Sequence, residues 1–184
     1  MIGKSDVLVV VDMQNDFITG SLGTKEAEAI VDKVAALIEE YHKNDGIVFA
    51  TMDTHRNLSY LDTVEGQHLP VKHCIQDTEG WQLHAKIDKL VNPYYRVLKE
   101  TFGAKMLPVS IDHELIKTDH MKFRSITLVG LCTDICVISN AVMCKAWFPD
   151  TPIRVIANAC AGSTPEAHHK AIELMRNSLQ IDII

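Results

Sequence analysis

The feature that most constrains the fold is an unbroken apolar run, Val7 to Val11, which ends at Asp12. A short and mostly β-branched run without polar alternation is typical of a strand buried on both faces of a parallel sheet. Residues 30–41 then carry apolar side chains at helical spacing, and residues 47–52 form a second apolar run. This order predicts a parallel β-α-β unit with a right-handed crossover.

The same alternation continues through the rest of the chain. Further strands are expected at residues 95–98, 125–130 and 153–157, and further helices at 80–90, 112–120, 135–147 and after Ser163. Ser163 and Glu166 have the spacing of a capping pair at the start of the last helix. Strands that alternate with helices predict a doubly wound, three-layer α/β/α fold around a mostly parallel sheet. With 184 residues and no linker or repeat, the chain is expected to form a single domain, residues 1–184.

The charge balance argues against nucleic acid and membranes as partners. The chain has 18 Lys and Arg against 24 Asp and Glu, a net charge of -6, whereas anionic surfaces attract basic proteins. No apolar run approaches the roughly 20 residues of a membrane-spanning helix, and the first run is too short for a signal peptide. We therefore expect a cytoplasmic protein whose five cysteines are free thiols.

Residues that carry chemistry follow the expected strands. Asp12 follows the first strand, Asp53 and His55 follow the second, Lys99 follows the third, and residues 130–136 follow the fourth. In an open parallel sheet, ligands bind at the carboxyl ends of the strands, and these ends share one edge. The sequence therefore predicts that a carboxylate, a pair of metal ligands, an ammonium group and a thiol meet at this edge.

Cys136 falls in the first turn of an expected helix, where free backbone N–H groups and the helix dipole stabilise a thiolate. Such a thiolate could attack a carbonyl carbon, and the same N–H groups could hold the resulting oxyanion. Asp12 would then be the general base, and Lys99 its charge partner. Position alone leaves the alternatives open, because Cys136 could be a buried inert thiol and Asp12 a loop carboxylate.

Asp53 and His55 are two residues apart, so in an extended segment their side chains point to the same side and could bind one cation. His73 could complete the site, and Glu65 or His68 could add a ligand directly or through water. Mixed nitrogen and oxygen ligands suit zinc, iron or manganese. The alternative is a polar loop in which histidines occur without a metal.

Taken together, these segments resemble a known family. The motifs are residues 12–17 (DMQNDF), 53–55 (DTH), 73–74 (HC), Lys99 and residues 130–137 (GLCTDICV). Their types and order resemble the isochorismatase-like cysteine hydrolases, and within them the nicotinamidases most closely. The resemblance covers essentially the whole chain and implies the isochorismatase-like hydrolase fold.

The resemblance implies a catalytic triad of Asp12, Lys99 and Cys136. Cys136 would attack an amide carbonyl and release ammonia, and water would then hydrolyse the thioester. The oxyanion hole would correspond to the backbone N–H groups of Cys132 and Cys136. A non-proline cis peptide is usual just before it, here at Leu131–Cys132.

The resemblance also implies a divalent metal on Asp53, His55 and His73, with Glu65 as the candidate for a further ligand that some members add. Zinc is the first expectation, with iron or manganese as alternatives. In nicotinamidases this metal binds the pyridine nitrogen of the substrate.

The resemblance implies that Phe17 flanks the substrate ring and that Leu131 lies in the same substrate pocket. Many nicotinamidases carry an aromatic residue shortly before the third metal ligand, where this chain has residues 69–72 (LPVK). Trp81 is the candidate to replace that aromatic residue.

The expected reaction is the hydrolysis of a small amide, nicotinamide, to nicotinate and ammonia. The alternative within the family is an amidase for a carbamoyl or ureido compound, whose enzymes generally lack the Asp-x-His…His pattern. A true isochorismatase does not need the cysteine nucleophile, so Cys136 argues against that reaction. A thiol-redox protein is disfavoured because three residues, not two, separate Cys132 from Cys136.

The expected helix over residues 135–147 has almost no charge, so we expect it to be buried on most sides. This helix and the Trp147-Phe148-Pro149 corner, which is expected to be exposed, suggest a homo-oligomer, a dimer or a tetramer, as in the relatives. A helix buried inside a monomer would look the same in the sequence.

Overall fold

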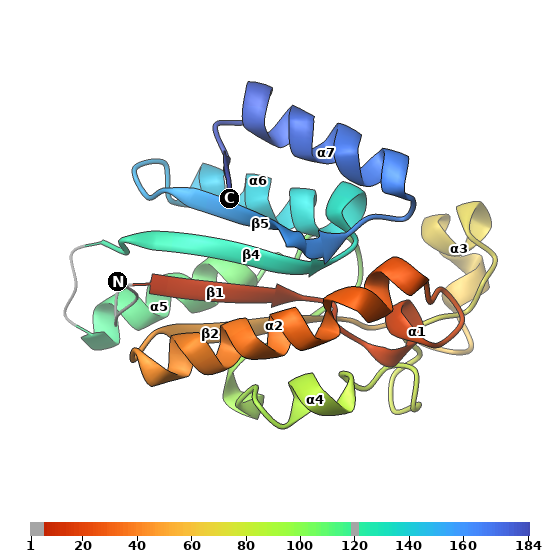
Figure 1. Ribbon diagram of the computed structural model, residues 1–184. Helices are drawn as coiled ribbons and strands as arrows, with labels where there is room; N and C mark the ends of the chain where they lie inside the picture. The colour runs from red at the N-terminus through yellow and green to blue at the C-terminus, as the bar shows by residue number, and fades with distance from the viewer. Residues whose placement is uncertain (1–5, 119–121) are drawn as a thin grey trace.

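The computed structural model of this protein describes residues 6–118 and 122–184 and contains one six-stranded sheet (Figure 1). The strands are β1 (Asp6–Val11), β2 (Ile47–Asp53), β3 (Arg96–Lys99), β4 (Ser125–Leu131), β5 (Ile153–Ala161) and β6 (Asp182–Ile183). Their order in the sheet is β3-β2-β1-β4-β5-β6, and every neighbouring pair is parallel. The predicted doubly wound α/β fold is therefore confirmed.

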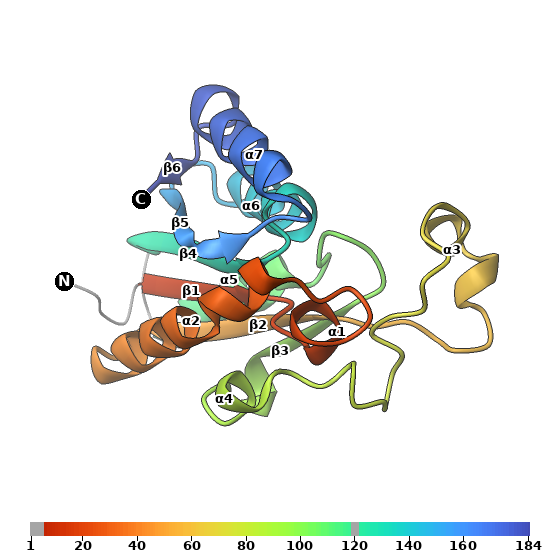
Figure 2. The same cartoon turned by 45° about the vertical axis from the view of Figure 1, so that its right-hand side comes forward.

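Helices cover both faces of the sheet. They are α1 (Asn15–Ile18), α2 (Lys25–Lys43), α3 (Val64–His68), α4 (Ala85–Asp88), α5 (Leu107–Thr118), α6 (Ile138–Trp147) and α7 (Pro165–Ser178). Buried residues of α2 and α4 pack on one face, and those of α5, α6 and α7 pack on the other. Figure 2 shows α3 standing away from these layers, on the side toward which the strand arrows point.

The central position of β1 explains its unbroken apolar sequence. Val7, Val9 and Val11 pack with the layer of α5, α6 and α7, and Leu8 and Val10 pack with the layer of α2 and α4. All five side chains are inaccessible to solvent. A strand with helices on both faces has no side on which a polar residue would be solvated.

The start of α7 differs from the prediction. Thr164, not Ser163, is the N-cap, and its Oγ1 accepts a hydrogen bond from the Ala167 N–H at 3.1 Å. The backbone N–H and the hydroxyl of Ser163 instead donate to Asp134, at 2.8 and 2.6 Å. The Ser-x-x-Glu capping prediction is therefore wrong, because a tertiary contact engages the serine.

Other boundaries also differ. The helix expected over 80–90 is confined to α4, and the loop region 53–80 contains a 3-10 turn (Tyr60–Asp62) and α3. The strand expected over 153–157 continues to Ala161, and the strand expected from residue 95 begins at Arg96. The helix expected over 112–120 begins at Leu107, and residues 119 and 120 lie outside the described part of the chain.

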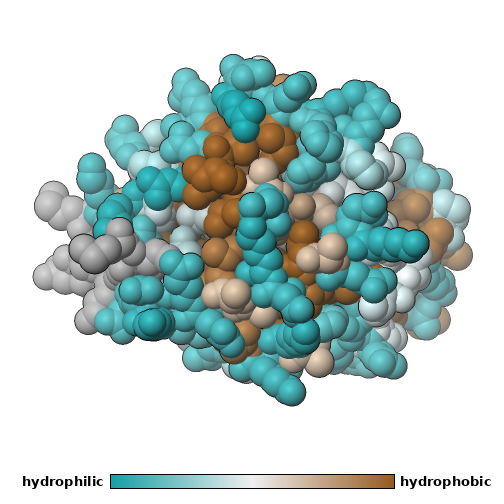
Figure 3. Space-filling model, in the orientation of Figure 1, coloured by the Kyte–Doolittle hydropathy of each residue, from teal (hydrophilic) through white to brown (hydrophobic). Residues whose placement is uncertain are grey.

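The surface is mostly hydrophilic in the view of Figure 3, and apolar residues gather near its middle. Helix α6 is less buried than predicted, because Val142 and Trp147 are 41% and 50% exposed. Phe148, expected at an exposed corner, is buried. The homo-oligomer remains a prediction. Among the described residues, no helix is long and apolar enough to cross a membrane.

Gly130 in β4 pairs with Val11 of β1 and has a φ of 113°. A Cβ at this position would lie 2.2 Å from the Val11 carbonyl oxygen. We expect Gly130→Ala to lower the free energy of unfolding by at least about 2 kcal/mol, because backbone strain and a clash add together. Urea unfolding measures this change. Gly46→Ala, in a turn without a positive φ, is the control, and equal stability of the two variants would contradict the prediction.

Candidate active site

The direction of the chain connections changes between β1 and β4, and ligands bind at such a switch point in open parallel sheets. Asp12 directly follows β1, and Cys132 directly follows β4. Asp53 and Lys99 are the last residues of β2 and β3, and the register places them opposite one another. The carboxyl ends of four strands thus bring these residues to one edge of the sheet, as predicted.

Lys99 is at the centre of this arrangement. Its Nζ lies 2.8 Å from Asp12 Oδ2, 3.0 Å from Asp53 Oδ1 and 3.5 Å from Cys136 Sγ. All four residues are buried. The structure therefore brings together the predicted carboxylate, ammonium and thiol around one cation.

Burial and charge set the protonation of this group. Burial lowers the pKa of Lys99, but the nearby Asp12, Cys136 and Asp53 raise it well above its ordinary value, so the ammonium remains charged. Burial raises the pKa of Asp12 despite the opposing charge of Lys99. The Thr51 hydroxyl donates a hydrogen bond to Asp12 Oδ1 at 2.7 Å and fixes the carboxylate. Asp12 is thus a stronger proton acceptor than an exposed carboxylate.

Burial also raises the pKa of the Cys136 thiol well above its usual range, and the Asp12 carboxylate raises it further, while Lys99 opposes the shift. The thiol and the Asp12 carboxylate share one neighbour, because Lys99 Nζ lies 3.5 Å from Cys136 Sγ and 2.8 Å from Asp12 Oδ2. The sulfur therefore keeps its proton until a base removes it, and the carboxylate that can act as that base lies on the same ammonium group.

Cys136 lies in a π-helical turn (Thr133–Val137) that leads directly into α6, not in the first turn of an α-helix. The N–H groups of Ile135 and Val137 both donate to the Cys132 carbonyl, at 3.1 and 3.0 Å. The Leu131–Cys132 peptide bond is cis, as the resemblance implied. The Cys132 N–H has no hydrogen-bond acceptor among the described residues, so it is available to a ligand.

Neighbouring segments hold this turn in place. Thr133 Oγ1 lies 2.8 Å from His168 Nδ1 of α7, and Asp134 accepts the two hydrogen bonds from Ser163. Asn140 of α6 donates to the Cys136 carbonyl at 2.8 Å, and its Oδ1 accepts from the Ala104 N–H at 2.9 Å. The turn that carries Cys136 is therefore tied to α7 and to the loop after β3.

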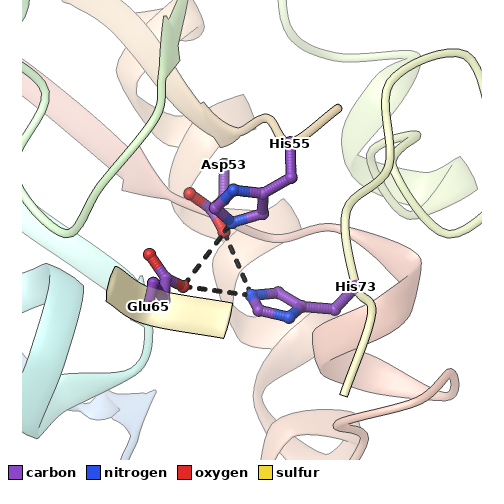
Figure 4. Close-up of side chains that lie close together, drawn as sticks. All are labelled: Asp53, His55, Glu65 and His73. Carbon is purple, nitrogen blue, oxygen red and sulfur yellow. Dashed lines mark hydrogen bonds and ion pairs between the residues drawn. The ribbon is translucent and has the colours of Figure 1, made fainter. Parts of the chain in front are cut away.

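Four potential metal ligands lie beside Lys99 and Cys136, and Figure 4 shows how their side chains converge: Asp53, His55, Glu65 and His73. One ligand atom from each of the four lies within 4.8 Å of the others. His55 Nε2 is 2.8 Å from Asp53 Oδ2, and His73 Nε2 is 3.3 Å from the same oxygen. Glu65 Oε1 is 3.5 Å from both imidazoles. His68 is exposed, and its Nδ1 contacts the Val64 carbonyl instead, so Glu65 rather than His68 joins the cluster.

The chemistry of these donors fits a divalent cation, because two imidazoles and two carboxylates converge in a largely buried space. Burial lowers the pKa of His73, but hydrogen bonds to Asp53 and Glu65 outweigh it and raise the pKa to about 10. Burial raises the pKa of Asp53, but His55, His73 and Lys99 hold it well below its ordinary value.

Gln14 was not singled out from the sequence. Its fully buried amide donates to the carbonyls of Asp53 and Trp81, both at 2.8 Å, and its Oε1 accepts from the Asp53 N–H at 2.7 Å. Gln14 therefore fixes the backbone of Asp53 on both sides. The signal that could have revealed it is the spacing Asp12-x-Gln14-x-Asp16, a run of polar side chains directly after a buried strand.

A cavity of about 290 Å³ is lined by Cys136 and by three of the four potential metal ligands, Asp53, Glu65 and His73. Its apolar lining includes Phe17, Leu22, Ala27, Leu69, Phe102, Leu131 and Ile135. Phe17 and Leu131 are thus in the predicted pocket. Trp81 does not line the cavity, and its Nε1 donates to Thr54 Oγ1 at 2.9 Å. Phe102, not Trp81, supplies the second aromatic ring of the lining.

Comparison with known proteins agrees with this geometry. The family model described as the isochorismatase domain matches residues 6–182. The chain belongs to the isochorismatase family. It is 25% identical to a nicotinamidase of Schizosaccharomyces pombe and 27% identical to one of Escherichia coli. These matches cover 96% and 93% of this chain, and 91% and 90% of the two relatives.

Solved structures of this family have the same fold. Nicotinamidase PncA from Bacillus subtilis is 25% identical, with a TM-score of 0.79, and the match covers 97% of this chain and 98% of that one. The structure of Pyrococcus horikoshii pyrazinamidase in complex with zinc is 24% identical, has a TM-score of 0.79, and covers 98% of each chain.

The charge of Asp12 raises the pKa of the Cys136 thiol, and this leads to a specific prediction for Asp12→Asn. The carboxylate that raises the thiol pKa is removed while Lys99 remains, so the Cys136 thiolate should form at lower pH than in the unmodified protein. Activity should nevertheless fall by at least about 10²-fold, because no proton acceptor remains.

Thiolate absorbance in the ultraviolet, followed against pH, measures the first effect. The same titration in proteins that also carry Cys136→Ala isolates this cysteine from the other four. A Cys136 thiol that titrates at the same or a higher pH in Asp12→Asn would contradict the prediction.

Proposed function

We propose that this protein is a nicotinamidase that converts nicotinamide to nicotinate and ammonia through a thioester on Cys136. The broader statement, that it is a hydrolase acting on an amide C–N bond, follows from the family and from its nicotinamidase relatives. The observation that carries the proposal is the placement of the Asp12, Lys99 and Cys136 group beside a four-donor cluster at one small cavity.

The cavity supports a substrate with a single ring. Its volume of about 290 Å³ is at the lower end of the range of ligand pockets, roughly 300–1,000 Å³. Phe17 and Phe102 offer aromatic surface, and the rest of the lining is mainly aliphatic. A carbamoyl or ureido substrate, the alternative within this family, would set its polar atoms against this apolar lining and would have no use for the four-donor cluster.

In the first half of the proposed reaction, Asp12 accepts the thiol proton and the Cys136 sulfur forms a bond to the amide carbon. The backbone N–H groups of Cys132 and Cys136 would hold the oxyanion, and Lys99 stabilises the negative charge that develops near Asp12 and the sulfur. Asp12 then returns the proton to the amide nitrogen as the C–N bond breaks, so ammonia leaves and a thioester remains.

In the second half, Asp12 accepts a proton from water, and the water oxygen bonds to the thioester carbon. The same N–H groups would hold the second oxyanion. When the C–S bond breaks, Asp12 returns its proton to the sulfur, and the product leaves as nicotinate after its carboxyl proton passes to solvent. Lys99 remains protonated throughout, because its pKa is raised well above the ordinary value.

Asp53, His55, Glu65 and His73 would hold the divalent metal, which we propose to be zinc, with iron or manganese as alternatives. When bound, such an ion supplies a Lewis acid that holds the ring nitrogen of the substrate. The chain's own contribution is to orient the ring between this cluster and Cys136, with Phe17 at its side.

The decisive experiment is ammonia release from nicotinamide by the purified protein. Cys136→Ala should reduce kcat by at least about 10³-fold, because the nucleophile is lost. Cys144→Ala is the matched control, since this buried cysteine in α6 does not line the cavity. Equal activity of the two variants would contradict the mechanism. Turnover of a ureido compound without turnover of nicotinamide would favour the alternative substrate.

Metal binding should release protons. Because the pKa of His73 is raised to about 10 in the metal-free protein, this imidazole is protonated at pH 7 and must lose its proton to bind a cation. Metal affinity should therefore rise with pH, and zinc binding near neutral pH should release about one proton. Titration calorimetry in buffers of different ionisation enthalpy measures the number. His55→Ala should weaken both binding and turnover, and binding without proton release would contradict the assignment.

A further inference from the structure

Asp16 belongs to the segment that follows β1, and the proposed mechanism gives it no role. Its Oδ2 accepts a hydrogen bond from the backbone N–H of Cys74 at 2.7 Å, across 58 positions of the chain. Its Oδ1 accepts from the Ser21 N–H at 3.3 Å, and its own N–H donates to the Gly80 carbonyl at 3.0 Å. Asp16 thus joins α1 to the segment that carries His73.

The backbone of Cys74 requires this carboxylate. Cys74 is completely buried and has a φ of 45°, a left-handed conformation that is uncommon for a residue with a side chain. Asp16 is the acceptor for its N–H among the described residues. Without that acceptor, a buried donor would be unpaired, and the segment would relax toward another conformation.

The position of the carboxylate is itself restricted by two glycines. A Cβ at Gly80 would lie 2.2 Å from Asp16 Oδ2, and a Cβ at Gly20 would lie 2.5 Å from Asp16 Oδ1. The space around the carboxylate is therefore filled on both sides, and its orientation is set by the packing of two loops.

We propose that Asp16 is the positioning residue for His73, an inference that rests on the metal site in the proposed function. His73 immediately precedes Cys74, and the Cys74 carbonyl accepts a hydrogen bond from the His55 N–H at 3.0 Å. Asp16 and His55 therefore hold the two sides of one peptide segment. This places His73 Nε2 3.3 Å from Asp53 Oδ2 and 3.5 Å from Glu65 Oε1.

The test measures cobalt(II) binding to the full-length, metal-free protein. Asp16→Ala should weaken cobalt affinity by about 10- to 100-fold, the usual effect of removing a group that orients a metal ligand. It should also change the visible spectrum of bound cobalt, which reports the coordination geometry. Asp16→Asn should restore affinity and spectrum, because its amide oxygen can accept the same N–H. Glu79→Ala, in the same loop as Gly80, is the control.

If Asp16→Ala has the same cobalt affinity and the same cobalt spectrum as the unsubstituted protein, the inference is overturned. It is also overturned if Asp16→Asn binds cobalt as weakly as Asp16→Ala. If Asp16→Ala does not fold, Gly80→Ala provides the second test of the inference. The Gly80→Ala variant keeps the Asp16 carboxylate, but the added Cβ displaces that carboxylate. Gly80→Ala should weaken binding, and unchanged binding would overturn the inference. If the unmodified protein binds no cobalt, the proposed metal site fails, and the role of Asp16 fails with it.

Discussion

The buried ammonium of Lys99 is the interaction on which the rest of this structure depends. A charge removed from water is unfavourable unless it is paired, and this one is paired with Asp12 and Asp53 beside the Cys136 sulfur. The pairing requires the ends of β1, β2 and β3 to be in register. A shift of one residue would turn Lys99 to the other face of the sheet and leave two buried carboxylates without their cation.

Asp53 connects the two halves of the site through its two oxygens. Oδ1 contacts Lys99, and Oδ2 contacts His55 and His73. The group around Lys99 and the four-donor cluster are therefore not separate units, since a substitution of Asp53 changes the charge balance of both. Gln14 holds the backbone of Asp53 from both sides, which explains why a neutral amide is completely buried at the start of a loop.

Most of the site could be predicted from the sequence, because parallel strands bring their carboxyl ends to one edge whatever the details of the loops. Asp12, Asp53, Lys99 and Cys136 all lie there. Phe102 could not be found in this way, because it lies on an irregular loop and is 47% exposed. Its place in the cavity depends on the loop after β3, which Asn140 of α6 holds by hydrogen bonds to Phe102 and Ala104.

The sequence by itself determined the alternation of the first five strands with the helices α2, α4, α5, α6 and α7, but not α1, α3 or β6. It also determined the types of reactive group at the sheet edge, because periodicity and strand ends are local properties of the chain. Only the tertiary structure decided which side chains in irregular segments reach the site. In the folded protein Glu65, not His68, joins the metal-ligand cluster, and Trp81 donates a hydrogen bond to Thr54. Ser163 donates to Asp134 instead of capping a helix. These outcomes depend on contacts between segments distant in sequence, and such contacts leave no periodic pattern in either segment.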